Sequence, residues 1–323
     1  MPRHERLDFT NAIHYARVRG QDGLEIFFDS LGFRRFPLTP RSNAPHVQKF
    51  EQLLAAACAE CGTLLHGYSV EPNSATLVLR TAGAPLRELM RRLVSRYSRY
   101  LRVEGFVPGK AVFGGRYDSK VIAPDYLAHA VRRAHRGPMA SGLGKRRGEY
   151  PFSSDRAYSG EISSLPIAMR DVKLALEQAG HVGSRGYREF MGQEETPSVA
   201  NLLSHGSPLD SRIAGDRAFV QDVRYLAAHP SAPPTREQFI ACMARLLNKT
   251  SADIVSATHI GTLGRALVAC YALRTGAATH SEVGRWFSVT GATLEQAIRH
   301  HRSVTPELFD LAVLPGLEFG TNV

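Results

Sequence analysis

The sequence predicts an α+β protein, with a ferredoxin-like domain followed by an all-α helix-turn-helix domain. Two observations predict this fold class. In the first half, short β-rich segments alternate with amphipathic helical segments, and from Asp216 onward the pattern is helical. A stretch rich in Ser, Gly and Pro separates the two halves, and 323 residues allow two or three domains. We therefore expect a first domain at residues 1–160, a linker with one bridging helix at 161–215, and a helical domain at 216–323.

The elements of the first domain follow from periodicity and turn residues. Strands are predicted where residues alternate and are rich in β-formers, and helices where apolar residues recur every three to four positions. Glu71-Pro72-Asn73-Ser74 is a turn sequence, and Gly137-Pro138 is expected to end a helix. The predicted order is a strand at 14–19, a helix at 44–60, strands at 64–70 and 75–80, a helix from 85 to about 102, an extended segment at 111–122 and a helix from 123 to about 136.

Composition favours an intracellular protein that binds a polyanion. The net charge is +10 and the pI is about 9.7, a balance that favours nucleic acid as partner. No apolar run approaches the ~18 residues of a membrane span, and no secretory signal is evident. The four cysteines lack zinc-finger spacing, so free thiols in a reducing cytosol are expected. We expect a cytoplasmic, nucleoid-associated protein that uses no cofactor.

The segment from Tyr68 to Arg80 reads Y-S-V-E-P-N-S-A-T-L-V-L-R. It resembles the Y-V-x-M-P-N-H-x-H-L-x-x-R motif of the REP-associated tyrosine transposases, which belong to the single-tyrosine HUH transposase family. That resemblance implies an HUH transposase domain over about residues 1–160. In the family, the two histidines bind the divalent metal that activates the scissile phosphate. Here the same positions hold Ser74 and Thr76.

Other segments match the same family in order along the chain. Pro2-Arg3, Tyr15 to Gly20, Phe27 to Asp29 and Gly148 to Tyr158 fit its conserved stretches. Arg132 to Leu143 resembles the family's R-Y-I-H-x-N-P-V-R-A-G-L, which carries the nucleophilic tyrosine. In this register Arg133 replaces the tyrosine, and Gly137 replaces the asparagine near which a further metal contact is expected.

These replacements predict an inactive transposase homologue. Phosphodiester transfer needs a nucleophile and a cation that stabilises the phosphate. Neutral hydroxyls are poor metal ligands, and an arginine is no nucleophile, although it binds phosphate well. The sequence therefore predicts no metal site and no cleavage. The alternative is an active transposase or nickase with a relocated nucleophile, for which Tyr126 is the first candidate and Tyr117 the second.

Basic residues of the first domain are candidate DNA contacts. Arg92, Arg96 and Arg99 recur at helical spacing on one side of the second helix. Tyr97 and Tyr100 interleave with them and are expected to stack on unpaired bases, the alternative being a solvated face with the tyrosines packed inward. Arg17 and Arg19 of the first strand and Arg133 complete the set.

The C-terminal region predicts a helix-turn-helix. Thr279 and Glu282 form a capping-box pair, Ser288 to Gly291 make a short turn, and a second helix follows to Arg302. Residues from about 239 to 303 also resemble the DNA-binding domain of the replication initiator DnaA, in which Arg265 falls within a matching Gly-Arg-Ala-Leu segment. The expected DNA contacts of the second helix are Thr293, Gln296, Arg299, His300 and Arg302.

Together these features predict a sequence-specific DNA-binding protein derived from a transposase, acting as a transcriptional or chromosome-associated regulator. The expected partner is duplex DNA, a DNA hairpin or both, and a homodimer is possible. A third hypothesis is an interaction module whose helical domain binds protein.

Overall fold

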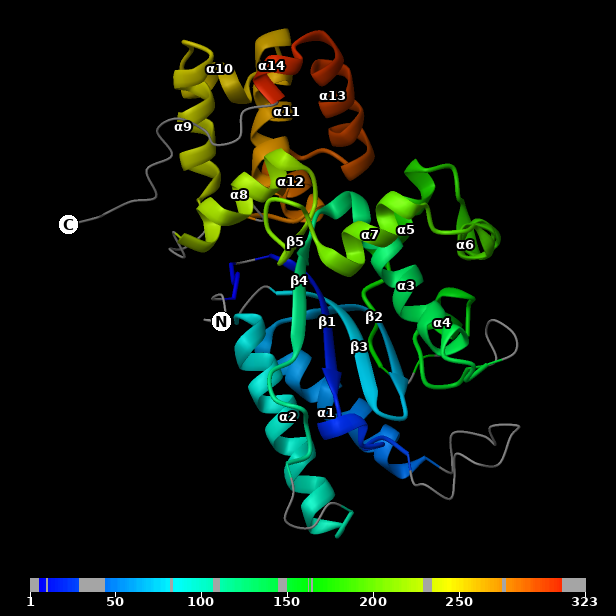
Figure 1. Ribbon diagram of the computed structural model, residues 1–323. Helices are drawn as coiled ribbons and strands as arrows, with labels where there is room; N and C mark the ends of the chain where they lie inside the picture. Colours follow the sequence, from blue (N-terminus) through cyan, green and yellow to red (C-terminus); the bar gives the residue numbers. More distant parts are fainter. Residues whose placement is uncertain are drawn as a thin grey trace, which may run out of the picture. The chain divides into compact units, whose positions relative to one another are not determined.

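The computed structural model describes residues 6–9, 11–28, 44–81, 84–106, 111–144, 150–161, 163, 165–228, 234–274 and 277–309. The chain divides into two compact units (Figure 1). Ala12–Gly215 form the sheet unit, and Asp216–Val323 with Met1–Asn11 form the helical unit. Some residues matched to the transposase family lie outside the described residues, namely Pro2, Arg3, Asp29, Gly148 and Glu149.

The sheet unit is built on five strands in the order β2-β3-β1-β4-β5 (Figure 1). β3 pairs antiparallel with β1 and β2, β1 pairs antiparallel with β4, and β5 is parallel to β4. The first three strands begin and end within one residue of the predicted bounds, whereas β5 was not predicted. The strands are β1 (Ile13–Arg19), β2 (Leu64–Glu71), β3 (Ser74–Arg80), β4 (Asp118–Ile122) and β5 (Ile213–Ala214), with a 3-10 turn η1 (Gln21–Gly23) after β1.

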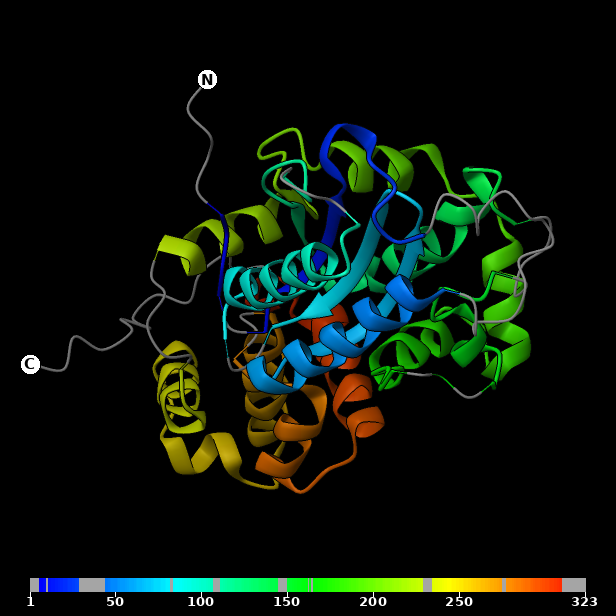
Figure 2. The same cartoon turned by 90° about the horizontal axis from the view of Figure 1, so that it is seen from below.

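Two long helices, α1 (Pro45–Cys61) and α2 (Leu86–Val103), lie side by side on one face of the sheet (Figure 2). Phe27, Phe50 and Tyr97 form an aromatic centre between them, with Phe27 stacked on Tyr97 at a centroid distance of 5.4 Å. The Tyr97 hydroxyl donates to the Ile26 carbonyl at 2.7 Å, which satisfies its polar atom inside the core.

The opposite face carries α3 (Leu127–Ala140), which follows the 3-10 turn η3 (Pro124–Tyr126). The prediction that Gly137-Pro138 ends this helix is wrong, because Pro138 is buried within its last turn. Proline lacks only its own N–H, so one intrahelical bond is lost there. The Gly137 and Pro138 carbonyls still accept from the backbone N–H groups of Ser141 and Leu143, at 3.0 and 2.8 Å.

Residues 161–215 are part of the sheet unit, which corrects the expectation of a linker. They form α5 (Arg170–Gln178), α6 (Gly183–Gly192) and α7 (Pro197–His205), and the short α4 (Asp155–Tyr158) precedes them. Leu176, Tyr187 and Phe190 pack with α3 in a second apolar cluster. A linker would leave these apolar side chains in water, and their burial explains why the segment folds onto the sheet.

Buried polar contacts tie the same segment down. Arg80 Nη2 lies 3.0 Å from Asp171 Oδ2, which joins β3 to α5. The Tyr187 hydroxyl donates to Asp155 Oδ1 at 2.5 Å and lies 2.8 Å from His135 Nδ1. His135 Nε2 in turn lies 2.6 Å from Ser154 Oγ. The four side chains connect α3, α4 and α6 through one buried network.

The helical unit contains seven helices in its described residues. Phe239, Leu267, Val283 and Leu294 lie in its apolar core. The predicted capping box is confirmed, because Thr279 and Glu282 exchange backbone-to-side-chain hydrogen bonds of 2.7 and 3.4 Å. The helices are α8 (Arg217–Ala228), α9 (Arg236–Leu246), α10 (Ser251–Val255), α11 (His259–Arg274), α12 (His280–Phe287), α13 (Gly291–Val304) and α14 (Pro306–Phe309).

Across the described residues of both units, every helix is too short or too polar to cross a membrane.

Candidate functional site

A cluster of polar side chains lies on the α3 face of the sheet. Strand register sets Ser69, Thr76 and Arg17 side by side across β2, β3 and β1. Directly opposed residues of neighbouring strands share one face of a sheet. By the same register, residues from adjacent rows join this face. The polar cluster comprises Tyr15, Arg17, Ser69, Glu71, Ser74, Thr76 and Lys120. The exposed pair Arg19–Asp118 lies on the same face at its edge.

An ion pair lies where the transposase motif has its first histidine. Arg17 Nη2 donates to Ser74 Oγ at 2.8 Å and lies 3.6 Å from Glu71 Oε2. The Ser141 hydroxyl donates to the same Glu71 oxygen at 3.0 Å. Ser74 and Thr76 are buried, with exposed fractions of 1% and 4%. Within the described part of the chain, no group of three or more His, Cys, Asp or Glu side chains is placed to hold a metal ion.

Tyr15 stands in the middle of the cluster, next to the second altered position. Burial raises the pKa of its phenol, while the positive charges of Arg133 and Arg17 and a side-chain hydrogen bond with Thr76 act in the opposite direction. The pKa of Lys120 is lowered, first by burial and then by the charge of Arg133, while Asp118 opposes that shift. Three cationic side chains therefore act on this part of the sheet.

Arg133, at the position of the family's nucleophile, is anchored to α7. Its guanidinium donates to the Ala200 carbonyl at 2.9 Å and to Ser204 Oγ at 2.5 Å, and lies 3.7 Å from Glu195. Gly137 lies against the acidic member of the cluster, since a Cβ there would be 3.1 Å from Glu71 Oε1. Both replaced positions thus border the polar cluster.

The sequence did not single out Tyr15, Ser69, Glu71 or Lys120 as site residues. Period-2 alternation along a strand predicts, from the sequence alone, that Ser69 and Glu71 share one face of β2. Which residues of β1 and β4 join them depends on strand register, which the sequence does not reveal.

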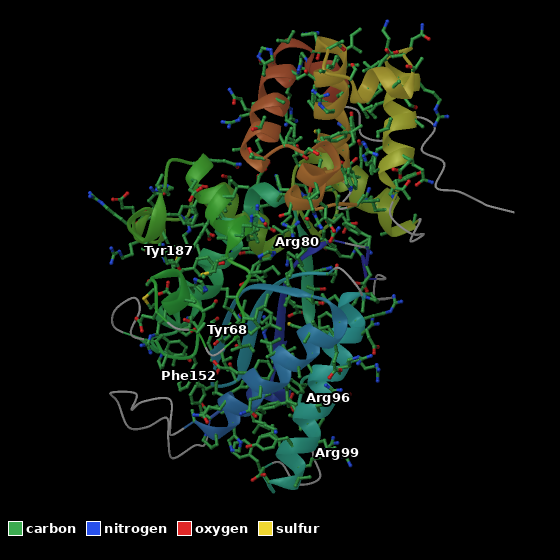
Figure 3. All side chains as sticks on the ribbon, turned by 180° about the vertical axis from the view of Figure 1, so that it is seen from behind. Tyr68, Arg80, Arg96, Arg99, Phe152 and Tyr187 are labelled. Carbon is green, nitrogen blue, oxygen red and sulfur yellow. The ribbon has the colours of Figure 1, made fainter. Side chains whose placement is uncertain are left out.

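The predicted basic face of α2 is largely neutralised by carboxylates. Arg92 and Arg96 both pair with Glu60 at 2.7 Å, and Arg92 also pairs with Glu88 at 2.8 Å. Hydrogen bonds from Arg96 and Arg92 lower the pKa of the Glu60 carboxyl to about 2. Arg99 is exposed, and Figure 3 shows it with Arg96 on the outer side of α2. This side of the unit is opposite to the polar cluster.

The tyrosines of α2 do not face solvent as the stacking hypothesis requires. Tyr97 is fully buried in the aromatic centre. Tyr100 is half-buried, and its hydroxyl lies 3.1 Å from His46 Nδ1. The structure instead has the alternative arrangement, in which the tyrosines pack inward. Both rings fill space between α2 and its neighbours.

Arg19, a further predicted DNA contact, is exposed and pairs with Asp118 at 3.0 Å.

The two alternative nucleophiles, Tyr126 and Tyr117, pack against different apolar clusters. Tyr126 is half-buried at the start of α3 and packs against the second apolar cluster. Tyr117 packs against the core beneath α1 and α2.

The region predicted to form a helix-turn-helix exposes polar side chains on α13. Its exposed side chains include all five predicted contacts: Thr293, Gln296, Arg299, His300 and Arg302. Arg265 is placed differently, because its guanidinium donates to the Val255 carbonyl at 3.1 Å and to that of Ser256. It therefore caps the end of α10, and its assignment as a DNA contact is not supported.

The turn between α12 and α13 depends on a close backbone approach. Ser288 adopts φ 54° and ψ 39°, the left-handed conformation that ends many helices. The Val289 N–H donates to the Gly284 carbonyl at 3.0 Å. A Cβ on Gly284 would lie only 2.8 Å from the Val289 carbonyl oxygen. The tight turn therefore needs a glycine on α12.

Comparison with known proteins gives little beyond this geometry. No family model and no curated protein matches the sequence. One solved structure that matches is a REP-associated tyrosine transposase bound to a REP hairpin. The match covers 50% of this chain and 87% of that chain, with 13% sequence identity and a TM-score of 0.37. A likeness at this level does not establish the family.

Proposed function

We propose that this chain is a transposase-derived DNA-binding protein that no longer cleaves DNA and acts as a transcriptional or chromosome-associated regulator. The observation that carries the proposal is the Arg17–Glu71 pair beside Ser74. At this position the resembling motif has a metal-binding histidine. A guanidinium there repels a divalent cation and attracts phosphate instead.

Three further features support the proposal. The order β2-β3-β1-β4, with α1 and α2 on one face, is the order of a ferredoxin-like domain, the fold expected of an HUH transposase domain. Arg133 stands at the nucleophile position and is bound to α7. The turn from α12 to α13 is short, as in a helix-turn-helix, and α13 exposes Arg299 and Arg302 for contact with DNA.

A relocated tyrosine receives no support from the geometry. Tyr126 and Tyr117 both pack against apolar clusters. Tyr15 lies in the polar cluster, but the raised pKa of its phenol disfavours the phenolate that attacks phosphate.

The test is a cleavage assay with the full chain. A labelled oligonucleotide that carries a palindromic hairpin and single-stranded flanks is incubated with the protein and Mg²⁺ or Mn²⁺. We expect an intact strand on a denaturing gel. A tyrosine-linked protein–DNA adduct would overturn the proposal, and Tyr15→Phe and Tyr126→Phe would then identify the nucleophile.

The regulatory part of the proposal needs its own measurement. Genomic fragments retained by the protein at physiological salt are sequenced. Enrichment of a few promoters with a duplex half-site is the expected result and assigns recognition to α13. Enrichment of palindromic repeats would assign recognition to the sheet unit and favour a chromosome-associated role. No enrichment contradicts sequence-specific binding.

A further inference from the structure

The polar cluster contains buried polar atoms without a partner. Ser69 is 1% exposed, and its Oγ makes no hydrogen bond to any described residue. The Nε of Arg17 is buried and equally unpaired among the described residues. Leaving a buried donor unsatisfied costs about 1–3 kcal/mol, so such atoms in a native structure call for an explanation. A ligand with acceptor atoms provides one.

The charges around these atoms favour an anion. The charges of Arg17 and Arg133 act on Tyr15, and that of Arg133 also acts on Lys120, which brings a third positive charge. Glu71 and Asp118 contribute negative charges, but Asp118 is paired with the exposed Arg19 at 3.0 Å. The distance of 3.6 Å between Glu71 and Arg17 is longer than a hydrogen bond. Arg17 is therefore held mainly by its 2.8 Å hydrogen bond to Ser74 Oγ, a neutral acceptor that a charged phosphate oxygen can replace.

The available donors fit a phosphate group. The guanidinium of Arg17 presents several N–H groups in one plane, which suits two oxygens of a phosphate. The Ser69 hydroxyl, two strands away on the same face, supplies a further donor, and Lys120 supplies a second charge. None of these groups needs a metal ion to bind a phosphate.

We propose that the polar cluster binds a backbone phosphate of DNA without a metal ion, through Arg17, Ser69 and Lys120, and that Glu71 weakens this binding by competing for Arg17. The identity of the ligand as a DNA phosphate rests on the function proposed above. The anion site itself rests on the unpaired buried atoms of Ser69 and Arg17 and on the positive charges beside them.

Four variants of the full chain are compared with the unaltered chain in buffer with EDTA. Affinity is measured for a fluorescent single-stranded oligonucleotide at physiological salt. We expect Glu71→Gln to bind about three- to tenfold more tightly, because it removes the competing charge, and Ser69→Ala to bind several-fold more weakly. The double variant Arg17→Met/Glu71→Gln should bind about tenfold more weakly than Glu71→Gln, and it leaves no buried carboxylate unpaired. The matched control is Arg185→Met on α6, an exposed arginine that pairs with Glu189, and it should bind like the unaltered chain.

Ser69→Ala keeps the test valid if the double variant fails to fold, since it removes only a hydroxyl without a partner. Equal affinity of Ser69→Ala and the unaltered chain, or binding that EDTA abolishes, overturns the proposal. A second readout separates the two proposals: inorganic phosphate should raise the melting temperature of the unaltered chain, and raise that of Ser69→Ala less. Stabilisation by phosphate without any binding of DNA would refute the proposed function and retain the anion site. No stabilisation by phosphate overturns the site.

Discussion

At the scale of single residues, burial strongly lowers the pKa of two histidines of the sheet unit, His14 and His66. His14 is 1% exposed, and neither ring nitrogen has a partner among the described residues. Burial lowers its pKa from 6.5 to about 3. His66 is also buried, and burial together with the charge of Arg80 lowers its pKa to about 4, but its Nδ1 lies 2.8 Å from the Ala168 carbonyl oxygen. Of these two residues, His14 is the one whose ring makes no compensating hydrogen bond to a described residue.

The lowered pKa of His14 predicts a loss of stability in acid. As pH falls below 6.5, the unfolded chain takes up a proton that folded His14 refuses until about pH 3. Above pH 6.5 this proton uptake does not affect the free energy of unfolding. Between pH 6.5 and about pH 3 it lowers the free energy of unfolding by up to ~1.4 kcal/mol per pH unit. Between pH 6 and pH 5, we expect the free energy of unfolding to fall by about 1 kcal/mol less in His14→Leu than in the unaltered chain. Urea unfolding at each pH measures this difference.

The same variant should be at least as stable at pH 7, because no hydrogen bond is removed. Exposed His205, changed to Gln, is the control and should leave the pH dependence unaltered. An unchanged slope for His14→Leu would show that the ring is hydrated in solution.

At the scale of elements, Gly284 of α12 and Gly291 of α13 differ in how closely another part of the backbone approaches them. Gly284 of α12 lies under the Val289 carbonyl, whereas a Cβ at Gly291, the first residue of α13, would meet nothing within 4 Å. Alanine is the better helix former by about 1 kcal/mol. Helix propensity alone would therefore favour alanine at both positions. The close Val289 carbonyl makes a side chain unfavourable at Gly284 but not at Gly291.

We predict that Gly284→Ala lowers the free energy of unfolding by about 1–2 kcal/mol, since the clash with a backbone carbonyl exceeds the gain in propensity. Gly291→Ala is the matched control and should be neutral or slightly stabilising. Thermal unfolding followed by circular dichroism measures both. A stable Gly284→Ala variant would mean that the turn is looser than described.

At the scale of the whole molecule, the boundary of the first unit lies at Gly215. The expectation of a boundary near residue 160 came from the Ser-, Gly- and Pro-rich composition of 161–215. Composition reports turn frequency, but it does not report that Leu176, Tyr187 and Phe190 are buried against α3. Loops between short helices and a linker share the same residue types.

A truncation tests this boundary. We predict that a fragment of residues 12–215 folds, whereas 12–160 melts on the order of 10 °C lower or does not fold, because several kcal/mol of apolar burial and the partner of Arg80 are removed. Melting by circular dichroism compares the two fragments. Equal melting temperatures would restore the linker interpretation.

The sequence by itself determined the first three strands, the helices α1 and α2, the capping box at Thr279 and the exposed residues of α13. These features depend on local periodicity, turn residues and capping, which neighbouring residues specify. It also predicted that Ser74 and Thr76 stand at the positions of the histidines in a resembling motif.

Only the tertiary structure decided what lies around those two positions. Arg17, Glu71 and Lys120 come together through the register of separate strands, and Arg133 reaches the cluster from a helix on the same face. It also showed that Glu60 neutralises Arg92 and Arg96, and that Arg265 caps a helix. Such pairings join residues far apart in the chain, so their energies depend on packing that no local pattern encodes.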